Sequence, residues 1–240
     1  MLNECLRGEH IQVALQPILR CHDRGLVAFE ALLRSNHAVL SGPLPVLRVA
    51  EHHDRIDAIA DVIFRRTGRW LEALPSWVSL FINLHPDELS DPARLTARLQ
   101  TLSAHADRVV LEITERSRLQ SIYGWEESLQ QAKEMGFAIA VDDLGSGYSS
   151  LSVLADLQPR FIKVDMSIVR GVDASRRKQR LVSMLCRFAE ATGAQLVAEG
   201  VETDDEAHAL LEAGTHLMQG YRFGRPSLDP VEIHHHLTPG

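Results

Sequence analysis

Polar side chains follow most of the short apolar runs of this chain, at the point where each run ends. They are Glu30, Asn83, Glu112, Asp142 with Asp143, Lys163, Glu199 and Gln219. Taken singly, a residue of this kind is more typical of a helix cap or a solvated loop. Several carboxylates directed into one site repel one another unless a cation binds among them, so their joint occurrence predicts a metal site.

The ligand types narrow the choice of metal. Carboxylates and an amide oxygen, with no obvious His or Cys ligand, favour Mg²⁺ or Mn²⁺ over Zn²⁺. The acids outnumber the needs of one ion, and a pair of ions can stabilise both the attacking and the leaving oxygen of a phosphoryl displacement. The pattern therefore predicts phosphoester hydrolysis. Among the acids, we expect Lys163 to stay charged and to hold a water or phosphate oxygen rather than act as a base.

The elements that would position these residues alternate short apolar runs with longer helical segments, which is typical of βα units. Eight runs are present, at residues 13–15, 26–29, 78–82, 109–111, 137–141, 161–162, 195–198 and 216–218. They predict an α/β fold, a (β/α)8 TIM-like barrel, whose strands end on one face and bring distant residues together. The first two runs are separated only by Arg20 to Gly25, which is too short for a helical crossover. We therefore expect an irregular antiparallel first strand.

Composition supports one globular unit and restricts its partners. The 240 residues are 45% hydrophobic and 24% charged, and barrels of about this length form one domain, so we expect a single domain over residues 1–240. No run approaches the about 20 apolar residues that span a bilayer, and no export signal begins the chain, which predicts a cytoplasmic protein with no membrane span. Three scattered cysteines predict free thiols. A net charge of −7 argues against DNA or RNA polymers as partners.

A glycine and hydroxyl segment, Gly145-Ser146-Gly147-Tyr148-Ser149-Ser150, follows the acidic pair directly. It could cradle a phosphate with backbone N–H groups, but glycine and serine also mark ordinary turns, and the lysine of a nucleotide-binding P-loop is missing. A mobile active-site loop is the favoured interpretation.

At these residues the sequence resembles the EAL-domain family of cyclic di-GMP phosphodiesterases, from roughly Leu6 to Pro226. The motifs, in order, are Gln16-Pro17-Ile18, Glu30-Ala31-Leu32-Leu33-Arg34, Asn83-Leu84, Leu111-Glu112-Ile113-Thr114-Glu115, Asp142-Asp143-Leu144-Gly145-Ser146-Gly147, Ile162-Lys163-Val164-Asp165, Ala198-Glu199-Gly200-Val201-Glu202 and Gln219-Gly220-Tyr221.

The resemblance implies hydrolysis of cyclic di-GMP to linear pGpG with two ions, Mg²⁺ or Mn²⁺. It implies one ion held by Glu30, Asn83, Glu112 and Asp142, and a second held by Asp142, Asp143 and Glu199. Glu30, Lys163 and Glu199 would be the catalytic residues, with Lys163 near the attacking water. Whether Glu199 serves as general base or as metal ligand stays open.

The same resemblance implies contacts outside the ligand set. Gln16 and Arg34 would contact the substrate phosphates, and Gln219 would lie near the water site. Glu115 would anchor the loop after the acidic pair. Glu202 would lie next to the metal ligands without binding an ion itself. A homodimer is also expected, through the face near that loop, with Trp125 or Phe188 as candidate contacts; apolar residues on helices more often belong to the core.

Four features depart from the family pattern. Leu144 stands where the family usually has Phe, Ser146 where Thr is common, and Met166 where Arg is usual. The stretch from Ser35 to Ala50 lacks the usual Trp and is shortened. These departures put the geometry of the loop and of part of the rim in doubt, but remove no predicted ligand.

Two other functions compete with this interpretation. EAL-like domains can bind cyclic di-GMP without cleaving it, but such receptors usually lack several acids, and every expected ligand is present here. A different metal-dependent barrel enzyme, one that removes a proton next to a carboxylate with a Lys base and Mg²⁺, would share the fold. Metal-dependent turnover would exclude the receptor, and product analysis would exclude the second enzyme.

Overall fold

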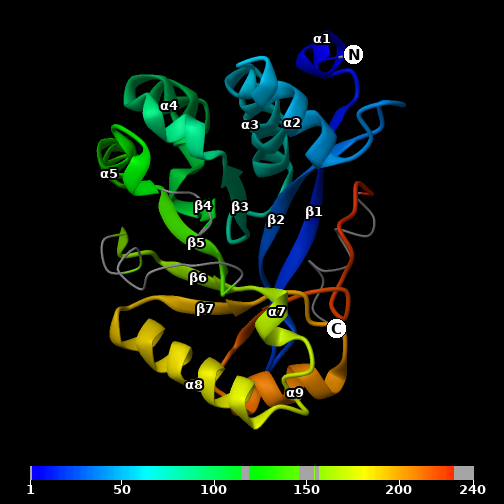
Figure 1. The fold of residues 1–240 in the computed structure, drawn as a ribbon, viewed down its shortest axis with the longest axis vertical. Coiled ribbons are helices and arrows are strands. Elements are labelled where there is room, and N and C mark those ends of the chain that lie inside the picture. Colours follow the sequence, from blue (N-terminus) through cyan, green and yellow to red (C-terminus); the bar gives the residue numbers. More distant parts are fainter. Residues whose placement is uncertain (1, 115–118, 146–153, 155–156, 230–240) are drawn as a thin grey trace.

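The computed structural model describes residues 2–114, 119–145, 154 and 157–229. Within these residues eight strands form a closed barrel in which neighbouring strands follow one another along the chain (Figure 1). The strands are β1 (Ile11–Arg20), β2 (Gly25–Ser35), β3 (Ser79–Leu84), β4 (Val109–Thr114), β5 (Ala138–Leu144), β6 (Phe161–Val164), β7 (Gln195–Ala198) and β8 (Leu217–Gln219). The predicted α/β barrel is confirmed.

The first strand breaks the regularity of the barrel. β1 pairs antiparallel with both β2 and β8, whereas the remaining pairs of neighbouring strands are parallel. The turn between β1 and β2 uses Arg24 at φ 53°, and the Gly25 N–H donates to Asp23 Oδ1 over 2.9 Å. Short polar turns of this kind join antiparallel strands. The predicted antiparallel first strand is therefore confirmed.

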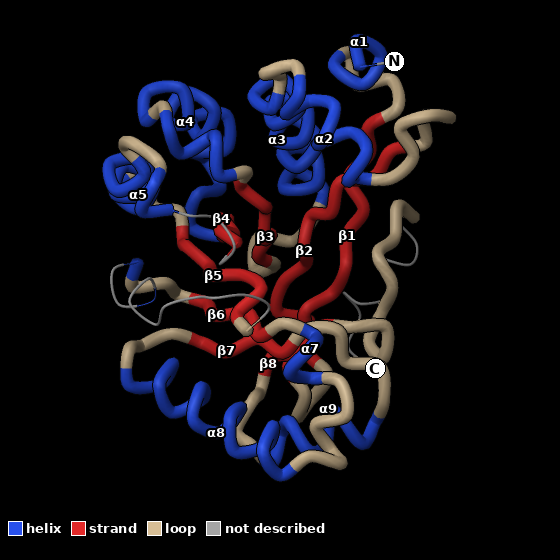
Figure 2. Tube along the Cα trace, viewed as in Figure 1, coloured by secondary structure: helices blue, strands red, loops and turns tan. Residues whose placement is uncertain are grey.

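Helices cover the outside of the barrel (Figure 2). Their bounds in the described residues are α1 (Leu2–Leu6), α2 (Pro43–His52), α3 (Ile56–Ala73), η1 (Pro86–Ser90), α4 (Pro92–Leu99), η2 (Gln100–Arg108), η3 (Leu119–Ser121), α5 (Trp125–Glu134), α7 (Met166–Val169), α8 (Arg176–Ala191) and α9 (Asp204–Glu212). α8 shows why they form. Ser175 caps its first turn by accepting from the Lys178 N–H, and Val182, Leu185 and Ala189 recur at three- and four-residue spacing and are buried.

The two aromatic residues and the three cysteines named from the sequence lie in or against the hydrophobic clusters of the protein. Trp125 and Phe188 are partly buried and pack against the main hydrophobic core, as the more ordinary alternative supposed. The three cysteines are free, with Cys5 buried and Cys21 and Cys186 partly buried. No helix in the described part of the chain combines the length and apolarity that crossing a membrane requires. Glu115 and residues 146–150 of the glycine and hydroxyl segment lie outside the described residues.

Candidate metal centre

The alternation of side chains along the strands builds two layers inside the barrel. The lower layer is an apolar cluster made of Ile18, Ala28, Phe81, Val110, Ala140, Phe161, Val197 and Leu217. Side chains two positions apart in a strand point to the same side. Two positions further toward the mouth stand, in the same strand order, Gln16, Glu30, Asn83, Glu112, Asp142, Lys163, Glu199 and Gln219. Every strand of the barrel therefore directs one polar side chain into a common upper layer.

This arrangement corrects one detail of the sequence interpretation. Glu30 does not end its strand, because β2 continues to Ser35, and Asp142 and Asp143 lie inside β5 rather than after it. What the polar residues share is an inward direction just above the apolar layer, not the last position of a strand. Gln16 joins the layer because β1 runs in the opposite direction and is paired through Gln16 with Glu30.

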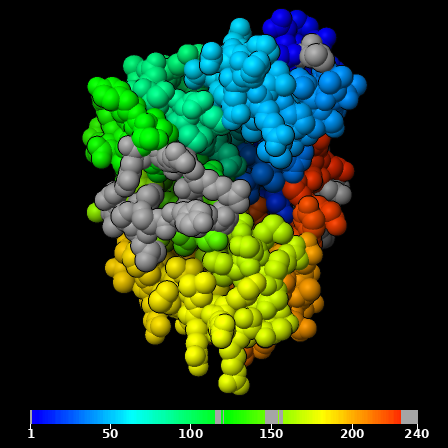
Figure 3. Space-filling model, viewed as in Figure 1, coloured from blue at the N-terminus to red at the C-terminus, as the bar shows by residue number. Residues whose placement is uncertain are grey.

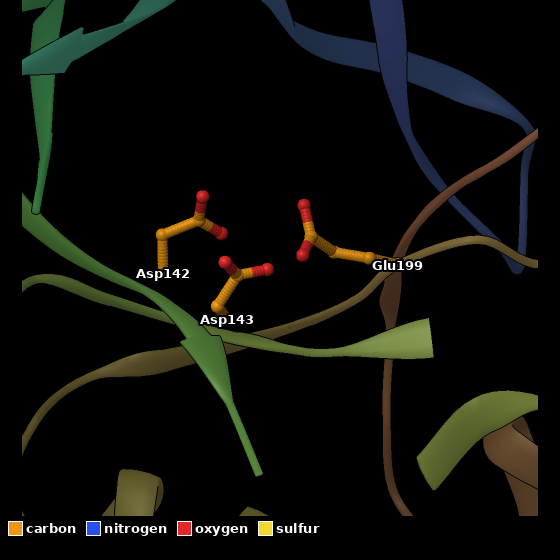
Figure 4. A group of neighbouring side chains, drawn as sticks. All are labelled: Asp142, Asp143 and Glu199. Atoms are coloured by element: carbon orange, nitrogen blue, oxygen red, sulfur yellow. The ribbon is translucent and has the colours of Figure 1, made fainter. Parts of the chain in front are cut away.

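Asp143 departs from the alternation and still reaches the site. The pairing of β5 with β6 shifts register between Val141 and Leu144, and Asp143 has φ 60°, in the left-handed region that residues other than glycine rarely adopt. Regular alternation would turn Asp143 away from its neighbour. Instead, single oxygens of Asp142, Asp143 and Glu199 all lie within 4.8 Å of one another (Figure 4). The irregularity therefore gives one strand two acids at the same site.

Lys163 is the cation at the centre of the upper layer, and its side chain is completely buried. Its Nζ lies 2.5 Å from Glu112 Oε1, 2.7 Å from Glu199 Oε1, and 3.3 Å from both Glu30 Oε2 and Asp142 Oδ1. Four carboxylates thus face one ammonium group. If all are ionised, the cluster carries an excess of negative charge in a place that water reaches poorly.

Amide side chains orient Glu30 from both sides. Asn83 Nδ2 donates to Glu30 Oε1 over 3.1 Å, and Gln219 Nε2 donates to Glu30 Oε2 over 2.6 Å. Gln219 Nε2 also reaches Gln16 Oε1 over 3.1 Å, while Gln16 Nε2 donates to the Gly224 carbonyl over 3.0 Å. Because Asn83 donates through its nitrogen, its amide oxygen is the atom that it can offer to a cation.

The buried charges shift one another's pKa values. Burial, with the nearby charges of Glu30 and Asp142, raises the pKa of Glu112 well above its ordinary 4.5. Burial likewise raises the pKa of Glu199 well above 4.5, against the pull of Lys163. Burial would lower the pKa of Lys163, but the surrounding carboxylates outweigh it and raise that pKa well above 10.5. Lys163 therefore keeps its proton, and part of the acid layer binds protons when no other cation is present.

The donor set fits hard divalent cations. In the described part of the chain, five buried side-chain atoms lack a hydrogen-bond partner, and all belong to this layer: Glu112 Oε1 and Oε2, Asp142 Oδ1, Lys163 Nζ and Gln219 Oε1. Lys163 Nζ approaches carboxylate oxygens closely, but not with hydrogen-bond geometry. Buried oxygens without partners are costly unless something binds them. Carboxylate and amide oxygens of this kind suit Mg²⁺, Mn²⁺ or Ca²⁺.

The other predicted site residues lie around this layer. A cavity of about 290 Å³ is lined by Gln16, Glu30, Asp143, Glu199 and Glu202 together with residues of the loops after β6, β7 and β8. Figure 3 shows the surface hollowed between the blue and cyan segments and the yellow-green segment that contains α7. Arg34 is not brought into this cavity. It donates to the Leu33 carbonyl and lines a separate cavity of about 240 Å³, which it shares with Asn83.

Sequence reasoning assigned no role to two residues near the acids. Arg170, just after α7, forms an ion pair with Glu202, and both side chains line the 290 Å³ cavity. Asp165 lines it too and caps α7 by accepting from the Ser167 N–H over 2.9 Å. Asp165 stands two positions after Lys163 and was quoted within a motif, so its place could be anticipated. Nothing in the sequence pairs Arg170 with Glu202, which is 32 residues away.

The raised pKa values of Glu112 and Glu199 predict how metal binding depends on pH. A carboxyl whose folded-state pKa is raised contributes stability that is present below its unfolded value of 4.5 and is lost as pH rises through the folded value. Divalent cations replace the protons, so the stabilisation they give should grow with pH. We expect the gap in melting temperature between Mn²⁺ and EDTA samples to widen from pH 5 to pH 8.

Other groups do not obscure this test. Burial raises the pKa of Glu88 to about 7 and its ion-pair partner is Arg98, not an acid of the upper layer, so we expect it to affect the Mn²⁺ and EDTA samples alike. The pKa of Glu30 is lowered, because Lys163 and two amides outweigh burial, so its contribution is complete by pH 5. A gap that stays constant or narrows as pH rises would contradict proton release from the acid layer.

Comparison with known proteins identifies the family of the chain. The family model of the EAL domain matches residues 1–226. The cyclic di-GMP phosphodiesterase RocR of Pseudomonas aeruginosa is 34% identical over 88% of this chain and 56% of its own length. The cyclic di-GMP phosphodiesterase NbdA of the same species is 31% identical over 94% of this chain and 30% of its own length. The chain thus spans about half the length of the first relative and under a third of the second.

Solved structures agree with this match. Klebsiella pneumoniae BlrP1, in complexes of cyclic di-GMP with calcium or manganese, has a TM-score of 0.82 at 32% identity over 91% of this chain and 56% of that one. A cyclic di-GMP complex of the PaMucR phosphodiesterase has a TM-score of 0.82 at 25% identity, covering 97% of both chains. With its barrel, its inward layer of acids and the match over residues 1–226, this chain belongs to the EAL-domain family.

Proposed function

We propose that this chain, acting as one EAL-type domain, is a phosphodiesterase that hydrolyses cyclic di-GMP to linear pGpG with two divalent cations, Mg²⁺ or Mn²⁺. The convergence of four carboxylates on one buried lysine carries the proposal, because one positive charge does not balance that site. The relatives named cyclic di-GMP phosphodiesterase supply the substrate.

Bound cations would supply positive charge that activates water and stabilises the oxygens of the phosphoryl group in the transition state. We assign one ion to Glu30, Asn83, Glu112 and Asp142, and the other to Asp142, Asp143 and Glu199. The proximity of Asp142, Asp143 and Glu199 supports the second group, and the hydrogen bond from Asn83 to Glu30 supports the first.

Lys163 acts in this proposal as a fixed charge. Its pKa is raised well above 10.5 by the acids around it, although burial alone would lower it, so it is a poor base. A proton held there can instead be donated in a hydrogen bond to the attacking water or to a phosphate oxygen. Glu199 lines the open cavity and stays the candidate for taking the proton from water, if it is not fully used as a ligand.

Gln16 and Gln219 would hold substrate at the rim of the same cavity. Gln219 Nε2 donates to both Gln16 Oε1 and Glu30 Oε2, so binding of a phosphate oxygen to this amide would exchange one of these bonds. Arg34 would approach the substrate from the neighbouring cavity that it shares with Asn83. A homodimer stays a prediction of the family resemblance.

The proposal is tested by incubating cyclic di-GMP with the protein and Mg²⁺, Mn²⁺, Ca²⁺ or EDTA, and separating the products by chromatography. We expect pGpG with Mg²⁺ or Mn²⁺ and intact substrate with EDTA. A binding titration on the same sample distinguishes the alternative, because tight binding without turnover under any of the metals would show a receptor instead.

A further inference from the structure

Glu206, in the first turn of α9, is a buried carboxylate that lies outside the acid layer. Its residue is 5% exposed, although glutamate is rarely buried without partners. Its partners are three backbone N–H groups. Oε2 accepts from Glu202 over 3.0 Å and from Thr203 over 3.3 Å, and Oε1 accepts from Gly171 over 3.0 Å.

These three N–H groups belong to two different segments. Glu202 and Thr203 lie in the loop that follows Glu199 at the end of β7. Gly171 lies just after α7, in the segment that follows Lys163 at the end of β6. The Glu206 carboxylate thus connects the segment that follows Glu199 to the segment that follows Lys163. The side chains of these two residues also meet, with Lys163 Nζ 2.7 Å from Glu199 Oε1.

The loop after Glu199 is closely packed on both sides, so a small movement of α7 or of the chain after β8 would also move this loop. Gly200 has φ 68°, and a Cβ there would lie 2.6 Å from Met166 Cβ at the start of α7. On the other side, the Val201 N–H donates to the Gln219 carbonyl at the end of β8, and the Val201 carbonyl accepts from the Arg222 N–H. At the end of this loop, the Glu206 carboxylate accepts from the backbone N–H groups of Glu202 and Thr203.

A capping role alone does not account for the contact with Gly171. In a capping box, the N3 carboxylate accepts from the backbone N–H of the N-cap residue, and the N-cap hydroxyl accepts from the N3 backbone N–H. Glu206 and Thr203 form this pair, with Glu206 N donating to Thr203 Oγ1 over 3.1 Å. The second oxygen of Glu206 accepts instead from the Gly171 N–H, just after α7. Consistent with an ionised group, the backbone N–H groups outweigh burial and lower the pKa of Glu206.

We infer that Glu206 is a positioning residue, which fixes the loop after Glu199 against α7 and thereby sets the place of the Glu199 carboxylate relative to Lys163 and Asp142. The inference rests on the proposed function, since it assigns Glu199 to a metal site. Residues that orient metal ligands from outside typically change metal affinity or activity about 10- to 100-fold when replaced.

The chain offers variants that separate this role from simple capping. Glu206→Ala removes all three acceptor contacts. Glu206→Gln keeps one acceptor oxygen for Glu202 and Thr203 but places an amide NH₂ against the Gly171 N–H. Thr203→Ala removes the cap hydroxyl and leaves the three contacts of Glu206 in place. Asp205→Asn removes one negative charge from the same turn at an exposed position.

Mn²⁺ binding, followed through the electron paramagnetic resonance signal of the free ion, gives a readout that does not require turnover. We expect Glu206→Ala to weaken Mn²⁺ binding about 10- to 100-fold and Glu206→Gln to weaken it by a smaller factor. Thr203→Ala should lower the melting temperature without changing Mn²⁺ affinity, and Asp205→Asn should change neither. In turnover, Glu206→Ala should need more Mn²⁺ for half-maximal rate, while KM for cyclic di-GMP at saturating Mn²⁺ stays within about twofold.

Wild-type Mn²⁺ affinity in both Glu206 variants would overturn the inference, and so would an equal loss in Thr203→Ala, which would show general destabilisation. Wild-type protein that binds Mn²⁺ but cleaves nothing would refute the proposed phosphodiesterase while leaving the effect of Glu206 measurable. Wild-type protein that binds no Mn²⁺ would refute both. If Glu206→Ala does not fold, Glu206→Gln decides, because it preserves the capping pair.

Discussion

Glu30→Gln is expected to lower the turnover of cyclic di-GMP by about 10³-fold or more, which corresponds to about 4 kcal/mol of transition-state stabilisation. The substitution keeps the size of the side chain and removes its charge. In the wild type Glu30 accepts from Asn83 Nδ2 and Gln219 Nε2. A glutamine amide has one acceptor oxygen, so its NH₂ would face one of these donors and its oxygen would be a weaker cation ligand.

Loss of folding would not explain this result. Glu30 lies among other carboxylates, and its charge raises the pKa of Glu112. Removing that charge relieves repulsion with Glu112, but it also removes the ion pair with Lys163 that helps to lower the pKa of Glu30, so the two effects on the metal-free fold partly cancel. We therefore expect the melting temperature in EDTA to stay within a few degrees of wild type, while the increase produced by Mn²⁺ shrinks. Turnover near the wild-type rate would refute the assignment of Glu30 as a metal ligand.

Lys163→Met is expected to lower kcat by about 10²- to 10⁴-fold and to change KM by only a few fold. Lys163 is completely buried below the mouth of the barrel, with Nζ within 3.3 Å of four carboxylates, so its charge acts at the reacting centre rather than on the exposed parts of the substrate. An interaction made mainly in the transition state affects kcat and kcat/KM together. Steady-state kinetics at saturating Mn²⁺ measures both quantities.

The matched control is Lys133→Met. Lys133 is a partly buried lysine whose Nζ donates to the Leu157 carbonyl over 2.6 Å, but it lies on α5, away from the acid layer. Lys133→Met should lower the melting temperature somewhat and leave kcat unchanged. A large rise in KM with unchanged kcat in Lys163→Met would show that Lys163 serves substrate binding, contrary to the role assigned to it.

Much of the barrel could be predicted because its signal is local. Short apolar runs alternate with helical segments, which predicts the βα units. The six residues from Arg20 to Gly25 leave no room for a helical crossover, so the antiparallel first strand follows from the length of this connection alone. The polar layer was also within reach. Each of its members stands two positions from an apolar residue of the layer below, with β1 reversed, and this is the period of a strand.

Other features depend on contacts that spacing does not specify. Alternation predicts that Asp143 points away from Asp142, and only the register shift at β5 with φ 60° at Asp143 brings both acids to one site. In the sequence both follow one apolar run, and the family resemblance assigns both to one ion; the alternation of side chains does not bring them together. Arg34 lies on the same face of β2 as Leu32, which lines the 290 Å³ cavity. Arg34 nevertheless lines the neighbouring cavity. The contact of Glu206 with Gly171 joins residues 35 positions apart.

Anomalous diffraction from crystals soaked in Mn²⁺ tests most directly whether the polar layer is a site for two divalent cations. We expect two peaks about 3.5 to 4 Å apart, one among Glu30, Asn83, Glu112 and Asp142 and the other beside Asp143 and Glu199. A layer without any ordered Mn²⁺ peak, in which Lys163 still contacts all four carboxylates, would contradict the assignment of this site as a metal centre.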